Sequence, residues 1–556
     1  MPFGYGDGGG GPTREMLFQA RRVADLEGSP KLAIEAPRAF FERAEAEHES
    51  PSVWVGELYL ELHRGTFTSV AEVKAGNRRN EHLLREAELW CATAAVRGLM
   101  DYPGERLAQL WRTVCLYQFH DILPGTCISW VYDEVLADHA RISAELTQLI
   151  TTAQSMLAGD GDDTVTFNAS PVAVGGVPAL SGTLAGPVHD RVRVDEVDGG
   201  WVIENASLRL AVDADGLITS LVDVASGRDA LPPGLRGNLL QVHPDFPNMW
   251  DAWDIDPFAF NTVTDVSTAD AIEVNASDDG VSLSVRRSFG SSHATQTLTV
   301  RPGDERVFVD VHVDWHERDT LLKLAWPLDV HTDHAAFEIE MGHLVRPTHT
   351  NTSWDAHRFE VHAHRWVHVG EPDFGVAIAN AQTYGWDVTR HARDGGGTFS
   401  IVRASLLKGA RFPDPRTDEG EHDFSFTLRP GASIEDAVAD GYASNLPTRT
   451  AQGSPVEPIV SLDGDVCVEA VKLAEDGSGD VVVRLYEPYG RRATATLHTG
   501  FDATSAVETD LLEEELVVGN ERQQVAPSAI ASVLADGALG LRLRPFQVAT
   551  IRFGRA

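Results

Sequence analysis

The sequence predicts a multidomain α+β protein: a short βα segment, then a bundle of about three helices, then antiparallel β-sandwich domains. Three observations lead to this fold class. Helical and apolar stretches alternate over roughly the first 50 residues. Apolar side chains then recur at helical spacing from about residue 71 to 155, and from about residue 163 short alternating strands are separated by Gly, Asp and Pro turns.

The composition is that of a globular protein, and 556 residues are enough for about three to five structural units. Hydrophobic residues make up 43% of the chain and charged residues 23%. The formal net charge of −37 argues against nucleic acid and anionic membranes as partners, because both require clustered cations. A neutral ligand such as a sugar is compatible with this charge.

The four cysteines indicate a reducing compartment. Cys91, Cys115, Cys127 and Cys467 show no CxxC spacing, which predicts neither a cysteine-based zinc site nor a disulfide framework. No stretch is long and apolar enough to span a bilayer, and the first residues lack the basic and apolar parts of a signal peptide. We therefore expect a cytoplasmic protein with no membrane partner.

The first elements follow the order of a βα domain. The pattern predicts a helix over 12–26 that Gly28 ends, a short apolar segment at 31–35, and a second helix from Pro37 to about residue 47. These are too few strands to close a sheet. The chain is therefore expected to begin inside a domain.

The segment 53–63 reads as a strand, because its side chains alternate between apolar and polar. On this interpretation Glu57 and Glu61 share one face with a phenol and an imidazole. The alternative is a solvated edge strand without a catalytic role.

Near the end of the next predicted helices lies Gln-Phe-His-Asp-Ile-Leu-Pro-Gly-Thr (118–126). It places His120 and Asp121 side by side, close to where Pro124 and Gly125 would stop a helix. An imidazole next to a carboxylate and a loop is well placed to bind a metal ion or a polyol. The alternative is a structural histidine.

The remaining chain has the pattern of antiparallel sandwiches. The run 208–222 alternates around Asp215-Gly216, which predicts a hairpin, and similar strands recur at 480–485 and 539–553. The Pro-containing stretch at 454–458 is expected to be a linker that sets off a last domain.

Six segments in order are specific enough to carry a family resemblance: 3–13, 56–68, 76–81, 118–126, 250–254 and 346–355. Together they resemble the family 38 α-mannosidases, in particular the cytosolic-type subgroup. The resemblance implies a retaining, zinc-dependent enzyme that removes terminal α-linked mannose from oligosaccharides. It also implies that 1–63 is the tail of a catalytic α/β barrel, 64–158 the helical middle domain, 159–450 a large β-sandwich region and 451–556 a C-terminal β domain.

The resemblance assigns His120 as a ligand of Zn²⁺, with Co²⁺ as an alternative ion. It places the nucleophile and most zinc ligands outside this chain, since no His-x-Asp motif with a barrel-strand context precedes the matching part. The isolated chain is therefore expected to be weakly active or inactive, with a separate N-terminal catalytic piece or a homo-oligomer as partner.

Further roles follow from the same resemblance. Glu61, ahead of Glu57, is the expected acid/base carboxylate. Asp121 and Asp7 are expected to contact the substrate, and Trp250 and Trp253 to stack on sugar faces. The alternative for the tryptophans is a buried pair.

Arg346 belongs to a polar cluster that either rims a cleft and binds substrate or joins two β-domains. His362, His364 and His368 form a row that either binds a metal ion or, as we prefer, packs at a domain contact.

A second hypothesis from another class is a non-catalytic carbohydrate-binding or scaffold protein, the remnant of such an enzyme. A different glycosidase family with a β-sandwich tail is disfavoured, because 56–68 and 118–126 match family 38 so closely.

Overall fold

The computed structural model describes residues 3–6, 10–48, 50–184, 186, 190–516, 528–534 and 537–555. The chain divides into two compact units, Met1–Tyr59 and Leu60–Ala556. None of the described helices is both long and apolar enough to cross a bilayer.

The first unit contains helices α1 (Arg14–Val23) and α2 (Pro37–Glu47). The hydroxyl of Thr13 accepts a hydrogen bond from the amide of Met16 at 3.2 Å and caps α1, which ends at Val23, earlier than the predicted end at Gly28. A proline opens α2, as the sequence predicts. The expected strand at 31–35 is wrong, because no strand occurs among the described residues of this unit. A strand without a neighbour leaves its backbone groups unpaired.

The predicted strand at 53–63 is also wrong. These residues run without regular structure, and the unit boundary between Tyr59 and Leu60 falls inside the segment. Leu58, Leu60 and Leu62, which an alternating strand would place on one face, are all exposed. The shared face of Glu57 and Glu61 therefore does not exist.

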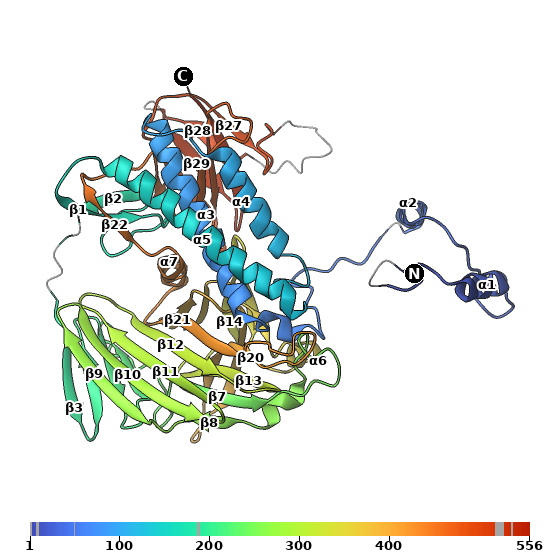
Figure 1. The fold of residues 1–556 in the computed structure, drawn as a ribbon, viewed down its shortest axis with the longest axis horizontal. Coiled ribbons are helices and arrows are strands. Elements are labelled where there is room, and N and C mark those ends of the chain that lie inside the picture. Colours follow the sequence, from blue (N-terminus) through green and yellow to red (C-terminus); the bar gives the residue numbers. More distant parts are fainter. Residues whose placement is uncertain are drawn as a thin grey trace. The chain divides into compact units, whose positions relative to one another are not determined.

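The second unit begins with the 3-10 turn η1 (Arg64–Phe67) and the helices α3 (Ala71–Val96), α4 (Gly104–Tyr117) and α5 (Ser129–Ala158). Figure 1 shows α3, α4 and α5 running side by side, which confirms the predicted three-helix bundle. Their core is built from apolar residues such as Trp90, Leu110 and Ile142. Helix α3 is buried on nearly every side, including many of its polar residues.

Two large antiparallel sheets pack against each other in the β region. Rings from one sheet meet rings from the other: Trp326 lies 5.4 Å and Trp386 6.1 Å from Phe426, measured between ring centroids. This contact confirms the predicted sandwich. Within the described residues, the nine-stranded sheet has the order β15 (Gly342–Pro347), β14 (His334–Ile339), β17 (Trp366–Glu371), β18 (Phe374–Asn380), β21 (Gly420–Pro430), β12 (Val307–Trp315), β11 (Ser292–Val300), β10 (Gly280–Phe289) and β9 (Ala271–Ser277). The six-stranded sheet has the order β16 (Val361–His362), β19 (Gly385–Ala392), β20 (Thr398–Lys408), β13 (Thr320–Leu328), β7 (Leu239–Pro244) and β8 (Thr264–Val266).

The smaller sheets are antiparallel as well. The hairpin expected at Asp215-Gly216 joins β5 (Leu208–Val212) and β6 (Ile218–Asp223), and Gly216 has the positive φ of 74° that its turn requires. One four-stranded sheet has the order β3 (Arg193–Val197), β4 (Gly200–Glu204), β5 (Leu208–Val212) and β6 (Ile218–Asp223). Two further four-stranded sheets lie toward the C-terminus. The first has the order β23 (Val460–Gly464), β26 (Ala493–Thr499), β29 (Leu539–Leu543) and β28 (Ile530–Val533). The second has the order β24 (Cys467–Leu473), β25 (Val481–Tyr486), β30 (Val548–Arg555) and β27 (Ala503–Thr509).

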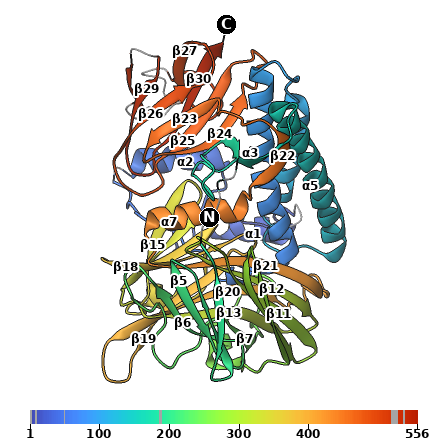
Figure 2. The same cartoon turned by 90° about the vertical axis from the view of Figure 1, so that its left-hand side faces the viewer.

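A small sheet ties the ends of the β region to the helices. It consists of β2 (Ser181–Leu184), β1 (Asp163–Asn168) and β22 (Arg449–Gly453), so a strand near the predicted boundary at 450 pairs with one just after α5. The four-part domain division itself remains a prediction. Figure 2 shows the C-terminal sheets and the two large sheets at opposite ends of the second unit, with α7 (Ile434–Asn445) between them. The short elements are η2 (Pro257–Asn261) and α6 (Ser353–His357).

Candidate functional site

His120 lies in the loop that joins α4 to α5. Helix α4 ends at Tyr117, seven residues before Pro124, so the sequence placed its end too late. Turn hydrogen bonds take over, with the amide of Ile122 donating to the carbonyl of Phe119 at 2.9 Å. The His120 side chain is 79% exposed, and its Nε2 lies 3.4 Å from Oδ2 of Asp121.

Asp121 connects the histidine to the rest of the loop. Its Oδ1 accepts a hydrogen bond from the hydroxyl of Thr126 at 2.9 Å, and its carbonyl accepts the Thr126 amide at 3.0 Å. The second carboxylate oxygen faces the imidazole of His120. Such a carboxylate can orient a ligating histidine or accept a hydroxyl.

The loop rests on the turn that precedes α3. Gly125 has a φ of +88°, and a Cβ there would lie 2.2 Å from the carbonyl oxygen of Ser69, so only glycine fits. The ammonium group of Lys74 donates to the carbonyls of Ser69 at 2.5 Å and Leu123 at 2.9 Å. Burial lowers the pKa of Lys74 to about 7.

The same turn holds the loop that carries the two tryptophans. The amide of Gly65 donates to the Trp253 carbonyl at 2.8 Å, and the hydroxyl of Ser69 donates to the Ala252 carbonyl at 2.7 Å. Arg64 and Asp254, each with a side chain 4% exposed, form a buried ion pair at 3.1 Å. Residues 64–70 therefore bring the His120 loop and the tryptophan loop to neighbouring positions.

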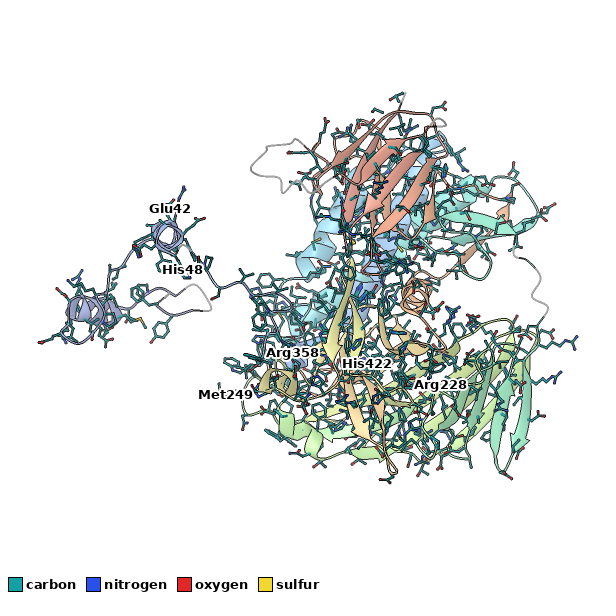
Figure 3. All side chains as sticks on the ribbon, turned by 180° about the vertical axis from the view of Figure 1, so that it is seen from behind. Glu42, His48, Arg228, Met249, Arg358 and His422 are labelled. Carbon is teal, nitrogen blue, oxygen red and sulfur yellow. The ribbon has the colours of Figure 1, made fainter. Side chains whose placement is uncertain are left out.

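Trp250 and Trp253 lie with ring centroids 5.9 Å apart in an edge-to-face arrangement. Trp250 is 52% exposed, so the pair is not buried, and Trp253 lies 6.4 Å from the ring of Phe412. Met249, which precedes Trp250 in the chain, is exposed as well (Figure 3). We call Met249, Trp250, Trp253 and Phe412 the aromatic surface; it is suited to the apolar face of a pyranose.

The two candidate acid/base carboxylates belong to different units of the structure. Glu61 belongs to the second unit, is exposed, and has Oε2 3.2 Å from Nδ1 of His357. Glu57 belongs to the first unit, where its carbonyl accepts the indole N–H of Trp54 at 3.2 Å. Asp7 lies outside the described residues. The roles of these three residues stay predictions.

Arg346 lies inside the β region. Its side chain is buried, donates to the carbonyl of His362 at 2.9 Å, and stacks on the ring of Phe337 at 4.8 Å. These contacts are those of a residue that joins structural elements, while its role in substrate binding stays a prediction.

The histidine row is half-buried and packs against neighbouring segments. The rings of His362 and His364 stack on Tyr384 at 5.6 and 5.8 Å, and His368 Nε2 lies 2.8 Å from the Ala432 carbonyl. Burial lowers the pKa of His362 to about 3. These contacts fit the packing interpretation.

The described residues do not form a complete zinc site. Zinc in proteins takes three or four protein ligands, mostly His, Cys and carboxylates. In the part of the chain that the structure describes, no group of three or more such side chains could hold a metal ion. His120 can contribute one nitrogen ligand, so a zinc ion bound there would need further ligands from elsewhere.

Sequence reasoning missed the contacts that hold the His120 loop. The segment 76–81 was noted only for its family resemblance, yet Asn77 and Glu81 on α3 accept hydrogen bonds from Gln118. One feature of the sequence could have indicated these contacts. The predicted helix from residue 71 has polar residues on all sides, so some of them must be buried against other elements.

Buried histidines predict a loss of stability in mild acid. Burial lowers the pKa of His139 to about 4, below about 6.5 for an unfolded histidine. The unfolded chain therefore binds more protons between these values, and the free energy of unfolding falls as the pH falls. The side-chain amide of Asn80 donates to Nδ1 of His139 at 2.9 Å. Protonation of Nδ1 would turn this acceptor into a donor and break the hydrogen bond.

In the unmodified protein, His139 is expected to lower the free energy of unfolding by about 2 kcal/mol when the pH falls from about 7 to about 5. In His139→Gln this part of the pH dependence should be absent. Urea unfolding of both proteins at the two pH values measures it. His293→Gln, on an exposed histidine, is the control. An unchanged pH dependence in His139→Gln would show that this imidazole is not the group that titrates.

Four family models match successive parts of the chain. They are the glycosyl hydrolases family 38 N-terminal domain over residues 1–57, the alpha mannosidase middle domain over 61–157, the family 38 C-terminal domain over 203–416 and the family 38 C-terminal beta sandwich domain over 465–551.

Curated relatives align along nearly the whole chain. The human protein named alpha-mannosidase 2C1 is 33% identical over 99% of this chain and 55% of its own length. Alpha-mannosidase G of Dictyostelium discoideum is 27% identical over 99% of this chain and 57% of its own length. The chain thus spans about half the length of the curated relatives it matches.

A solved structure shares the fold. The crystal structure of an alpha-mannosidase from Enterococcus faecalis V583 superposes with a TM-score of 0.73 at 15% identity, covering 97% of this chain and 74% of that one. At this identity the similarity shows the fold alone.

Proposed function

The chain belongs to glycoside hydrolase family 38, and on that premise we propose that it forms the C-terminal part of an α-mannosidase. The enzyme would remove terminal α-linked mannose from oligosaccharides in the cytoplasm. The observation that carries this proposal is the succession of four models of one family over most of the chain.

We propose a zinc-dependent, retaining reaction. His120 would be one ligand of Zn²⁺ or Co²⁺, because its imidazole is exposed beside a carboxylate. When bound, the ion would supply Lewis-acid orientation of sugar hydroxyls. Its other ligands and the nucleophile are proposed to lie outside these 556 residues, on a separate N-terminal piece or a longer form of the chain.

The chain's own residues would bind and orient the sugar. A retaining glycosidase needs two carboxyl groups about 5–5.5 Å apart. Glu61 is the proposed acid/base, with Glu57 as the second candidate, because Glu61 is exposed in the same unit as His120. Asp121 would accept a sugar hydroxyl.

Other contacts would follow from the aromatic surface. Trp250 and Trp253 would stack on the pyranose, and Asp7 would line the cleft. Arg346 would have to move before it could reach a sugar, because its guanidinium is buried. Self-association into a homo-oligomer is proposed by analogy.

Hydrolysis of p-nitrophenyl α-mannoside with added zinc or cobalt tests this function. The isolated chain is expected to show at most weak turnover, and the chain extended by the coding sequence upstream in its gene is expected to be active. Rapid turnover by the isolated chain would contradict its incompleteness, and an inactive extended chain would contradict the proposed function.

His120→Ala in the extended chain is expected to abolish measurable turnover without lowering the melting temperature, because the side chain is exposed. His498→Ala is the matched control, since its Nε2 lies 3.3 Å from Asp463 in a similar exposed His–Asp pair. Full activity of His120→Ala would exclude the proposed ligand.

The exposed aromatic surface supports a second candidate, a non-catalytic carbohydrate-binding protein. Calorimetric titration with manno-oligosaccharides tests it. Binding without hydrolysis by the extended chain, lost in Trp250→Ala, would favour this candidate over the enzyme.

A further inference from the structure

Gln118 is held by two side chains of helix α3. It follows the last residue of α4 and lies two residues before His120. Its amide nitrogen Nε2 donates to Oδ1 of Asn77 at 3.0 Å and to Oε1 of Glu81 at 2.7 Å. Both donor hydrogens of this amide are therefore used, and its orientation is fixed.

The two acceptors are themselves fixed within a packed layer. Asn77 is buried, and its own amide nitrogen donates to the hydroxyl of Tyr384 at 3.3 Å, which directs its oxygen toward Gln118. Arg78 stacks on the Tyr384 ring at 4.3 Å and donates to the His364 carbonyl at 2.8 Å. The start of the His120 loop is thus tied through α3 to the large β region.

The other end of the loop is held independently. Lys74 donates to the Leu123 carbonyl, and Gly125 lies directly against Ser69. Between these two anchors the His120 side chain is exposed, with Asp121 beside its Nε2 and the ring of Phe119 4.2 Å from its own ring centroid. Both of these neighbours belong to the same loop, so the direction of the imidazole depends on how the backbone of the loop is held.

We propose that Gln118 is a positioning residue for His120, and that Asn77 and Glu81 are its anchors. Its catalytic consequence rests on the proposed mannosidase function, whereas its effect on the loop does not. Because a ligand or substrate contact requires placement within a fraction of an ångström, the two hydrogen bonds matter beyond their contribution to stability.

Hydrogen exchange of the 556-residue chain tests the placement directly. Gln118→Ala is expected to speed exchange of the amides at 119–126 about tenfold, while the amides of α3 stay protected. Gln109→Ala is the matched control, because Gln109 is an exposed glutamine on α4 whose Nε2 contacts Glu105 at 3.5 Å. Unchanged exchange in Gln118→Ala, or equal acceleration throughout α3, would overturn the proposal.

Two variants of Glu81 separate positioning from general structure. Glu81→Gln keeps an oxygen that can accept from Gln118, so its loop should exchange at the unmodified rate. Glu81→Ala removes the acceptor and should reproduce the acceleration of Gln118→Ala. Acceleration in Glu81→Gln equal to that in Glu81→Ala would contradict the role of this hydrogen bond.

In the active extended chain, Gln118→Ala should lower kcat about tenfold or more and change KM little, with Glu81→Gln restoring kcat relative to Glu81→Ala. Accelerated exchange with an unchanged kcat would overturn the link to His120. If the extended chain has no mannosidase activity, the proposed function fails while the exchange experiment still decides the positioning role.

Discussion

Lys323→Met is expected to lower the free energy of unfolding of the second unit by about 3–5 kcal/mol. The ammonium group of Lys323 lies 2.6 Å from carboxylate oxygens of both Glu360 and Asp387, and all three side chains are at most 2% exposed. Arg403 donates to Asp387 at 2.9 Å, so two cations balance two anions. Methionine would fill a similar volume but leave a buried carboxylate without its cation.

The directions of the carboxylate pKa shifts support this reading. Burial raises the pKa of Glu360, which depends on Lys323 to keep its charge. Burial also opposes the charge of Asp387, but Arg403 and Lys323 together hold its pKa below the ordinary value. Glu360 is therefore the group expected to suffer most from the loss of Lys323.

Urea unfolding followed by tryptophan fluorescence measures the effect. Trp326 lies on β13 with Lys323, and Trp386 lies on β19 beside Asp387, so both indoles report on these strands. Lys31→Met, on an exposed lysine 3.4 Å from Asp25, is the control and should cost less than about 1 kcal/mol.

Lys323→Met combined with Glu360→Gln should recover part of the loss, because the unpaired carboxylate is then neutral. A single variant as stable as the unmodified protein would show that the pair contributes nothing.

Arg64→Met is expected to cost about 3 kcal/mol and to release the tryptophan loop. Arg64 pairs with Asp254 at 3.1 Å, donates to the His357 carbonyl at 3.2 Å, and stacks on Phe359 at 4.5 Å. Its loss would leave the Asp254 carboxylate buried without this guanidinium. The loop that carries Trp250 and Trp253 would then lose its side-chain anchor to η1 and keep the hydrogen bond from the Gly65 amide.

Thermal unfolding and iodide quenching of tryptophan fluorescence measure the two effects. Arg141→Met is the control, because Arg141 forms an exposed pair with Asp138 at 2.9 Å and such pairs contribute little. Arg64→Met with Asp254→Leu should regain stability, since both buried charges are then removed. A melting temperature for Arg64→Met equal to that of Arg141→Met would contradict the prediction.

Features set by near neighbours in the chain could be predicted well. Pro37 opens α2 and Gly216 occupies its hairpin turn, because proline and glycine restrict or permit particular backbone angles by themselves. The long amphipathic stretch from residue 71 to 155 forms three helices as expected. In each case the deciding interaction lies within a few residues.

Features that need a distant partner could not be predicted. The alternating pattern at 53–63 is that of a strand, but no other strand pairs with it among the described residues. The end of α4 was misplaced because the chain turns at Gln118, whose side chain is held by α3 about 40 residues away. The local sequence pattern shows neither whether a strand has a partner to pair with nor which distant side chains hold Gln118.

For the candidate site, the sequence by itself determined the family, the neighbouring His120 and Asp121, and the aromatic character of 250–254. Only the tertiary structure decided that residues 64–70 join these segments, that Arg346 is buried and the histidine row half-buried, and that Glu57 and Glu61 belong to different units. The physical reason is that residue chemistry and backbone preference are local, whereas burial and hydrogen-bond pairing are fixed by segments that meet only after folding.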